Sequence, residues 1–269
     1  MTKNWYELSI AAIMNEIFKA EGLEIEFDNS KFFADELKRW QEGQSPATKK
    51  RILNIAHQAR KYAFNKKYGA YNYDTDVRTV FPEWGQKLYS LISRYLTQDN
   101  NNIVSVGSNI GVELTEIFPN HENQHIDIVE ISKDAVMEGK KMFPHFNFVC
   151  ASMDETSLSG NHYDVYLNLR AAYCAGNDLD VTMRYAYSCL KQEGIGVVSV
   201  SNGYIKQGEK PEVIVGVYNP NTQKCSSEET DRNLNWVYNA MQQARFKSIS
   251  KHDIGSEIVL LGHKVKIRN

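Results

Sequence analysis

Hydrophobic residues in the first hundred positions recur at the three- and four-residue spacing that is typical of amphipathic helices. This pattern predicts helices over residues 5–20, over 30–40, from residue 45 onward and over 82–96. Gly22 ends the first helix, while Ser45 and Pro46 supply a cap and a first-turn proline for the third. The tyrosine-rich residues 67–81 break the periodicity, so we expect an ordered loop there.

After residue 102 the pattern changes to short β-branched runs that alternate with helical stretches. The runs lie at 103–106, 126–129, 146–149, 164–167 and 196–200. Their spacing leaves room for a crossover helix between successive runs, which predicts a parallel, doubly wound sheet. A helix over 228–244 and strand-like runs at 247–251 and 257–261 follow, which predicts a hairpin at the edge of the sheet.

The predicted architecture is therefore α/β, with a doubly wound, seven-stranded, mostly parallel sheet that ends in a C-terminal antiparallel hairpin. We expect two parts, a helical N-terminal cap or lid over residues 1–98 and a Rossmann-like domain over residues 99–269. No internal repeat or flexible linker separates them, so we expect the cap to pack on the sheet domain.

The composition of the chain excludes several classes of protein. The 269 residues are 42% hydrophobic and 24% charged, which excludes collagen-like and broadly disordered chains. The formal net charge of −2 lacks the basic excess of nucleic-acid-binding proteins, so nucleic acid is disfavoured as the main partner. Four widely spaced cysteines without a CxxC pair indicate free thiols, and no segment resembles a signal peptide or a membrane span. We therefore expect a cytoplasmic protein that does not enter a membrane.

The candidate chemistry begins where the first predicted strand ends. The turn Val106-Gly107-Ser108-Asn109-Ile110-Gly111 leads into a predicted helix, so a ligand can approach both the backbone and the free N–H groups of the helix. Glu130 ends the second predicted strand, 19 residues after Gly111, where a carboxylate can accept hydrogen bonds from ribose hydroxyls. The pair predicts a nucleoside-containing ligand; a tight structural turn and a surface glutamate are the alternative.

Five segments in the same order resemble class I S-adenosylmethionine-dependent methyltransferases. They are VGSNIG, IDIVEIS, FVCASMDE, YDVYLNLR and residues 190–196, and with the terminal hairpin they cover about the last two thirds of the chain. The resemblance implies an enzyme with S-adenosyl-L-methionine as its cofactor. The cofactor-binding residues that it implies are Gly107, Ser108, Asn109, Gly111, Glu130, Ile131, Ser152, Met153, Asp154, Asn168 and Leu169, with Arg78 for the cofactor carboxylate.

Three positions depart from the pattern of that family. Ser105 stands where an acid is common, Asn109 replaces a glycine, and Ser152 replaces an aspartate, so Met153 and Asp154 become the candidates for contacts with adenine. Asparagine tolerates a positive φ, so we expect the turn to survive.

The acceptor should lie beyond the carboxyl ends of the strands. The substrate-binding candidates are Tyr71, Tyr73, Arg170, Tyr173, Asn202 and Tyr204, and residues 67–81 are expected to close over the acceptor as a lid. Methyl transfer is an in-line displacement in which the protein chiefly aligns the reactants, and Tyr173 and His162 are candidate proton acceptors. We expect no catalytic metal, because no His, Asp or Glu cluster has metal-ligand spacing.

Transfer of a methyl group to a small-molecule acceptor is the favoured function, and three alternatives remain. An NAD-dependent oxidoreductase would want glycine at Asn109. An RNA- or protein-modifying methyltransferase is a second alternative, although residues 168–171 lack the NPPY-type motif of nucleic-acid amino-methylating enzymes. A non-catalytic Rossmann-like ligand-binding module would explain the changes at Ser105 and Asn109. The acceptor atom and the oligomeric state stay open.

Overall fold

The computed structural model describes residues 9–28, 33–68, 82–97, 101–153, 158–172, 178–202, 226–255 and 257–265. No helix in these ranges is both long and apolar enough to cross a membrane.

Within the described residues the N-terminal cap contains three helices, α1 (Ile10–Ala20), α2 (Phe33–Gln41) and α3 (Pro46–Tyr68). The Ser9 hydroxyl caps α1, and Gly22 follows its end with a φ of +66°. The indole of Trp40 packs edge-on against Phe18 and two further phenylalanine rings, so an aromatic cluster holds the helices together. The sequence pattern thus predicts the type of each helix, although residues 1–8 and 29–32 lie outside the described ranges.

Seven strands form one sheet in the order β3-β2-β1-β4-β5-β7-β6. The strands are β1 (Asn102–Val106), β2 (His125–Glu130), β3 (Asn147–Cys150), β4 (Tyr163–Leu169), β5 (Leu190–Ser201), β6 (Lys247–Asp253) and β7 (Glu257–His263). Strands β1 to β5 are parallel, whereas β7 runs antiparallel to both β5 and β6. The predicted fold class is confirmed. The order of strands reverses between β1 and β4, the place where open α/β sheets bind ligands.

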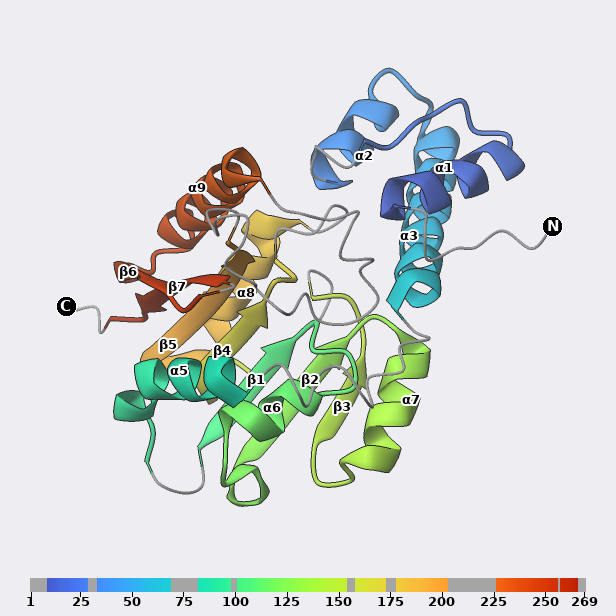
Figure 1. Cartoon of the computed structure of the whole chain (residues 1–269). Coiled ribbons are helices and arrows are strands. Elements are labelled where there is room, and N and C mark those ends of the chain that lie inside the picture. The colour runs from blue at the N-terminus through green and yellow to red at the C-terminus, as the bar shows by residue number, and fades with distance from the viewer. Residues whose placement is uncertain are drawn as a thin grey trace.

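Helices cover both faces of the sheet (Figure 1). One core joins the strands to α5 (Pro82–Ile92), α6 (Val112–Ile117) and α7 (Lys133–Met142), and a second core joins them to α8 (Leu179–Cys189) and α9 (Ser227–Gln243). Short 3-10 turns, η1 (Ser93–Tyr95) and η2 (His121–Asn123), follow α5 and α6. Successive side chains alternate between the two cores, as the period of a strand requires: Val259 of β7 belongs to the first and Leu260 to the second.

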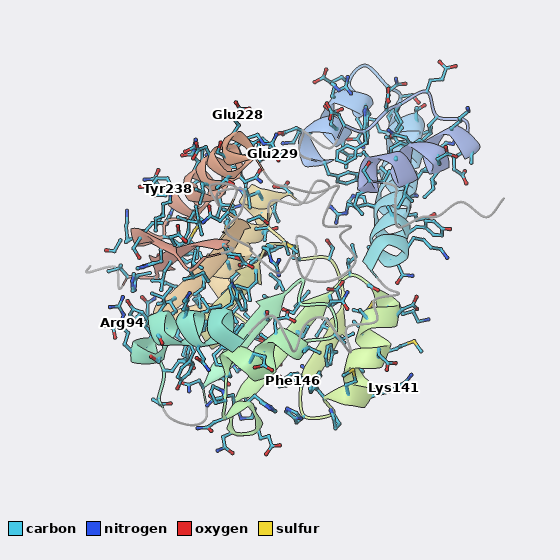
Figure 2. All side chains as sticks on the ribbon, viewed as in Figure 1. Arg94, Lys141, Phe146, Glu228, Glu229 and Tyr238 are labelled. Atoms are coloured by element: carbon cyan, nitrogen blue, oxygen red, sulfur yellow. The ribbon has the colours of Figure 1, made fainter. Side chains whose placement is uncertain are left out.

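Helix α9 begins with a complete capping box. The Ser226 hydroxyl accepts from the N–H of Glu229, and the Glu229 carboxylate accepts from the N–H of Ser226. Glu228 and Glu229 lie together at this end of the helix, where negative charge stabilises the helix dipole (Figure 2).

The cap contacts the sheet domain through α3. Arg60 of α3 is buried and donates to the Ser152 hydroxyl, just after β3, with an Nη2–Oγ distance of 2.6 Å. The Ser132 hydroxyl, just after β2, donates to Asn65 of α3 at 3.1 Å. Both contacts lie beyond the carboxyl ends of strands, so the cap stands at the edge of the sheet where a ligand is expected (Figure 1).

The division of the chain at residue 98 stays a prediction. Helix α5 precedes that residue, but Trp84 and Leu88 of α5 share a core with Ile103 of β1 and Leu114 of α6. The helix therefore packs with the sheet, whereas the hydrophobic core of the cap is built from residues of α1, α2 and α3 and of the segment that joins α1 to α2.

Candidate functional site

The turn between β1 and α6 has three residues in the left-handed region. Gly107, Asn109 and Gly111 have φ values of +74°, +50° and +83°. A Cβ atom at Gly107 would lie 2.5 Å from the Cβ of Ala171, and one at Gly111 would lie 2.6 Å from Cδ1 of Ile128. Both glycines are therefore required by the backbone conformation and by close packing, and asparagine supplies the third left-handed residue.

Glu130 lies at the end of β2 and is only 5% exposed. Its Oε2 accepts from the N–H of Asn109 at 2.9 Å, and its Oε1 accepts from the N–H of Ser132 at 2.8 Å. Burial raises the pKa of Glu130, and these N–H donors oppose that rise. The carboxylate thus braces the glycine turn, a role that the sequence did not predict. The backbone N–H of Ile131 also acts on it, which leaves only part of its acceptor capacity for a further donor.

Two predicted cofactor-binding side chains meet beside the end of β4. The Nδ2 of Asn168 donates to the Sδ of Met153 at 3.4 Å. Asn168 is fully buried, and its Oδ1 has no hydrogen-bond partner among the described residues. An unpaired buried acceptor is unfavourable, so this atom is suited to receive a donor from a ligand.

Arg170 follows β4 with a φ of +57° and is held by an acid that the sequence analysis missed. Its Nε donates to the Oε1 of Glu257 at 2.7 Å, and Glu257 is only 1% exposed. The backbone N–H of Arg170 donates to the Ser199 hydroxyl, which joins the ends of β4 and β5. Glu257 opens the strand-like run 257–261, but nothing in that run indicates a partner 87 residues earlier in the chain.

Glu113, in the first turn of α6, is the second acid that the sequence analysis missed. Its side chain is buried and forms a hydrogen bond with the Ser108 hydroxyl. Burial raises its pKa to about 7, the bond with Ser108 and the charge of Arg170 lower it, and the charge of Glu130 raises it further. The sequence signal, a glutamate directly after a glycine turn, equally fits an ordinary helix N-terminus.

The structure does not bring His162 to the same edge as these groups. His162 directly precedes β4 and is exposed, whereas Asn168 and Arg170 lie at the opposite end of that strand. A residue before a parallel strand lies at the amino edge of the sheet, so His162 lies away from the edge where the acceptor is expected, and its role as a proton acceptor stays a prediction.

The remaining candidates fall into two groups. Asn202 donates to Asp253 and to the Gly255 carbonyl, and it therefore ties the end of β5 to the β6–β7 turn. Leu169 packs against the core beneath α5 and α6, and Ile131 packs against the core of the cap. Tyr71, Tyr73, Arg78, Asp154, Tyr173 and Tyr204, together with most of the expected lid, lie outside the described residues.

Two solved structures illustrate the similarity of fold. A protein from Methanococcus maripaludis, provisionally described as an S-adenosyl-L-methionine-dependent methyltransferase, superposes with a TM-score of 0.57 and 15% identity over 71% of this chain and 90% of that chain. The [4+2]-cyclase SpnF superposes with a TM-score of 0.51 and 14% identity over 72% of this chain and 85% of that chain. The chain has the class I methyltransferase fold. Family models and curated proteins give no match.

At these identities the similarity concerns the fold and leaves the chemistry to be argued from the site. One of the two structures is named for a cyclisation, so this fold carries more than one reaction. The groups at the carboxyl edge of the sheet must therefore carry the functional argument.

Proposed function

We propose that this protein is an S-adenosylmethionine-dependent methyltransferase that transfers a methyl group to a small-molecule acceptor. One observation carries the proposal: the buried carboxylate at the end of β2 is bonded to the N–H of Asn109 in the left-handed glycine turn after β1. This arrangement places a preorganised hydrogen-bond acceptor beside a turn at the switch point of the sheet, which suits a nucleoside.

The described residues fit such a cofactor. Glu130 keeps acceptor capacity for a ribose hydroxyl, and the unpaired Oδ1 of Asn168 can accept from an amino or hydroxyl group. Met153 is half-buried beside Asn168, where its thioether can cover an adenine face. The bound cofactor would supply a methyl group that the sulfonium charge already activates.

The protein's own part is alignment and exclusion of water. We place the acceptor beyond β4 and β5, near Arg170 and Asn202, with Tyr173 as a further candidate. Because Glu257 holds the Arg170 guanidinium, the positive charge of Arg170 would face an acceptor in a fixed orientation. The cap, anchored by the contact between Arg60 and Ser152, would cover the site and reduce the access of water.

Binding measurements test the proposal directly. S-adenosylmethionine and S-adenosylhomocysteine should bind in calorimetric titrations, whereas NAD should not. The purified protein with labelled S-adenosylmethionine should transfer label to the small-molecule fraction of a cell extract, and not to its protein or RNA fraction.

Each contrary result points to one alternative. Binding of NAD in place of the two sulfur compounds would favour the oxidoreductase. Label in the protein or RNA fraction would favour a macromolecular acceptor. Binding of S-adenosylmethionine without transfer in any fraction would favour a ligand-binding module or another reaction of this fold.

A further inference from the structure

A chain of three polar side chains runs beneath the glycine turn. The carboxyl group of Glu113 bonds with the Ser108 hydroxyl, which in turn contacts the hydroxyl of Ser105 in β1. All three side chains are buried, and Glu113 is the most exposed of them at 9%. These contacts link the carboxyl group of Glu113 to the point where β1 enters the turn.

The charges at this edge of the sheet are unbalanced. Glu113, Glu130 and Glu257 are buried carboxyl groups, Arg60 is a buried cation bonded to Ser152, and Arg170 is the cation that acts on Glu113 among the described residues. Arg170 is in direct contact with Glu257, so it offers Glu113 only a longer-range attraction. The two arginine charges cannot neutralise all three carboxylates, and a buried carboxylate without a partner tends to take up a proton.

We propose that Glu113 is a positioning residue of the glycine turn and that it releases a proton when a positively charged group binds beside Ser105 and Ser108. This inference rests on the proposed function, because the α-ammonium group of the cofactor is the cation in question. A nearby cation stabilises the ionised carboxylate, and the ionised carboxylate in turn strengthens the binding of the cation.

A second buried acid, Glu130, is an alternative source of pH-dependent binding and requires a control. The charges that act on Glu113 are those of Arg170 and Glu130, and the pKa of Glu130 is itself raised by burial. A pH-dependent affinity could therefore come from either glutamate. Adenosine separates the two, because it carries the ribose hydroxyls that Glu130 is predicted to bind but lacks the ammonium group.

Calorimetric titration with S-adenosylhomocysteine at several pH values is the test. Since burial raises the pKa of Glu113 to about 7, the affinity should be roughly tenfold weaker at about pH 6 than at about pH 8. Titrations near pH 7 in buffers with different ionisation enthalpies should show the release of about half a proton on binding. Adenosine should show neither effect.

The variant Glu113→Gln should bind S-adenosylhomocysteine with an affinity that no longer changes over this pH range, and its affinity for adenosine should equal that of the wild type. Glu138→Gln is the matched control, because Glu138 is half-exposed on α7 and pairs with Lys141. If Glu113→Gln does not fold, Ser108→Ala serves instead. Loss of the hydroxyl should raise the pKa of Glu113, so the pH profile for S-adenosylhomocysteine should move to higher pH.

The outcomes distinguish this inference from the proposed function. Tight binding of S-adenosylhomocysteine with equal affinity at low and high pH would overturn the role of Glu113 and leave the methyltransferase proposal standing. An equal pH dependence for adenosine would assign the titration to Glu130 and overturn the inference. Failure of both compounds to bind would overturn the proposed function and the inference with it.

Discussion

Replacement of Glu130 by alanine tests two roles of one carboxylate. The first role is structural, because Oε1 and Oε2 accept from the backbone N–H groups of Ser132 and Asn109 at 2.8 and 2.9 Å. The second is the predicted bond to ribose hydroxyls. A carboxylate at the end of a strand would ordinarily support little of the core, but this one is buried and braces the turn.

The structural cost follows from the two donors. Each buried N–H group left without an acceptor costs about 1–3 kcal/mol, and alanine also removes the desolvation penalty that raises the pKa of Glu130. We therefore expect Glu130→Ala to lower the free energy of unfolding by about 1–4 kcal/mol. For a chain of this size, each kcal/mol lowers Tm by roughly 2–4 °C.

The effect on binding is measured separately, well below the melting temperature of the variant. Loss of charge-assisted bonds to the ribose is worth roughly 1.5–3 kcal/mol, so the Kd for S-adenosylhomocysteine should rise about ten- to a hundredfold. Thermal melts and calorimetric titrations of the wild type, Glu130→Ala and the exposed control Glu138→Ala provide both numbers. A folded variant with a lower Tm and a Kd within about twofold of the wild type would refute the ribose assignment and keep the structural role. An unchanged Tm would refute the bracing argument.

Three further predictions concern stability. Gly107→Ala places a Cβ 2.5 Å from a neighbouring side chain at a φ of +74°, so denaturant unfolding should show a free energy of unfolding that is lower by about 2–5 kcal/mol. In the control Gly160→Ala the nearest atom would lie 3.9 Å from the new Cβ, so the free energy of unfolding should change little. The folded-state pKa of Glu113, about 7, lies above its ordinary value of 4.5, so the contribution of Glu113 to the free energy of unfolding is lost as the pH rises through about 7. Near pH 8 the variant Glu113→Gln should therefore be more stable than the wild type by up to about 3 kcal/mol. The ring nitrogens of His121 and His145 are 2.9 Å apart, and burial and the charge of His145 lower the pKa of His121. This pair should therefore stabilise the fold above about pH 6.5 and lose that effect on acidification. Thermal melts of His145→Ala in which Tm falls on acidification just as in the wild type would refute this.

The sequence predicts the central strands well because β1, β4, β5 and β7 are apolar runs whose side chains are buried on both faces, whereas the edge strands β3 and β6 are largely exposed. All seven runs become strands, and only the bounds differ. Strand β5 begins at Leu190, six residues before the predicted run, because Lys191 to Gly194 are polar or lack a side chain and their extended backbone leaves no hydrophobic signal. Backbone pairing with β4 and contact with the C-terminal strand decide that start, and neither is local information.

Some residues of the candidate site could likewise be predicted from the local sequence, and others could not. Glu130 was predictable because it directly follows an apolar run, and the end of such a run is the carboxyl edge of a parallel sheet. His162 stands before a run, so the same rule places it at the other edge. Glu257 and Glu113 were not predictable, because their burial depends on which strand lies beside β5 and on how α6 packs over the turn.

The hydrogen bonds at this edge explain why a ligand with donor groups suits it. Glu130 accepts from two backbone N–H groups, Arg170 is fixed by Glu257, and Asn202 is bonded to the β6–β7 turn, so the site is held in shape before a ligand arrives. Within the described residues, the Oδ1 of Asn168 and the Oε2 of Glu257 are buried acceptors without donors. Each such atom costs the free protein about 1–3 kcal/mol, and a ligand that donates a hydrogen bond removes that cost. Both of these atoms are acceptors, so amino and hydroxyl groups of a ligand can supply the hydrogen bonds that they lack.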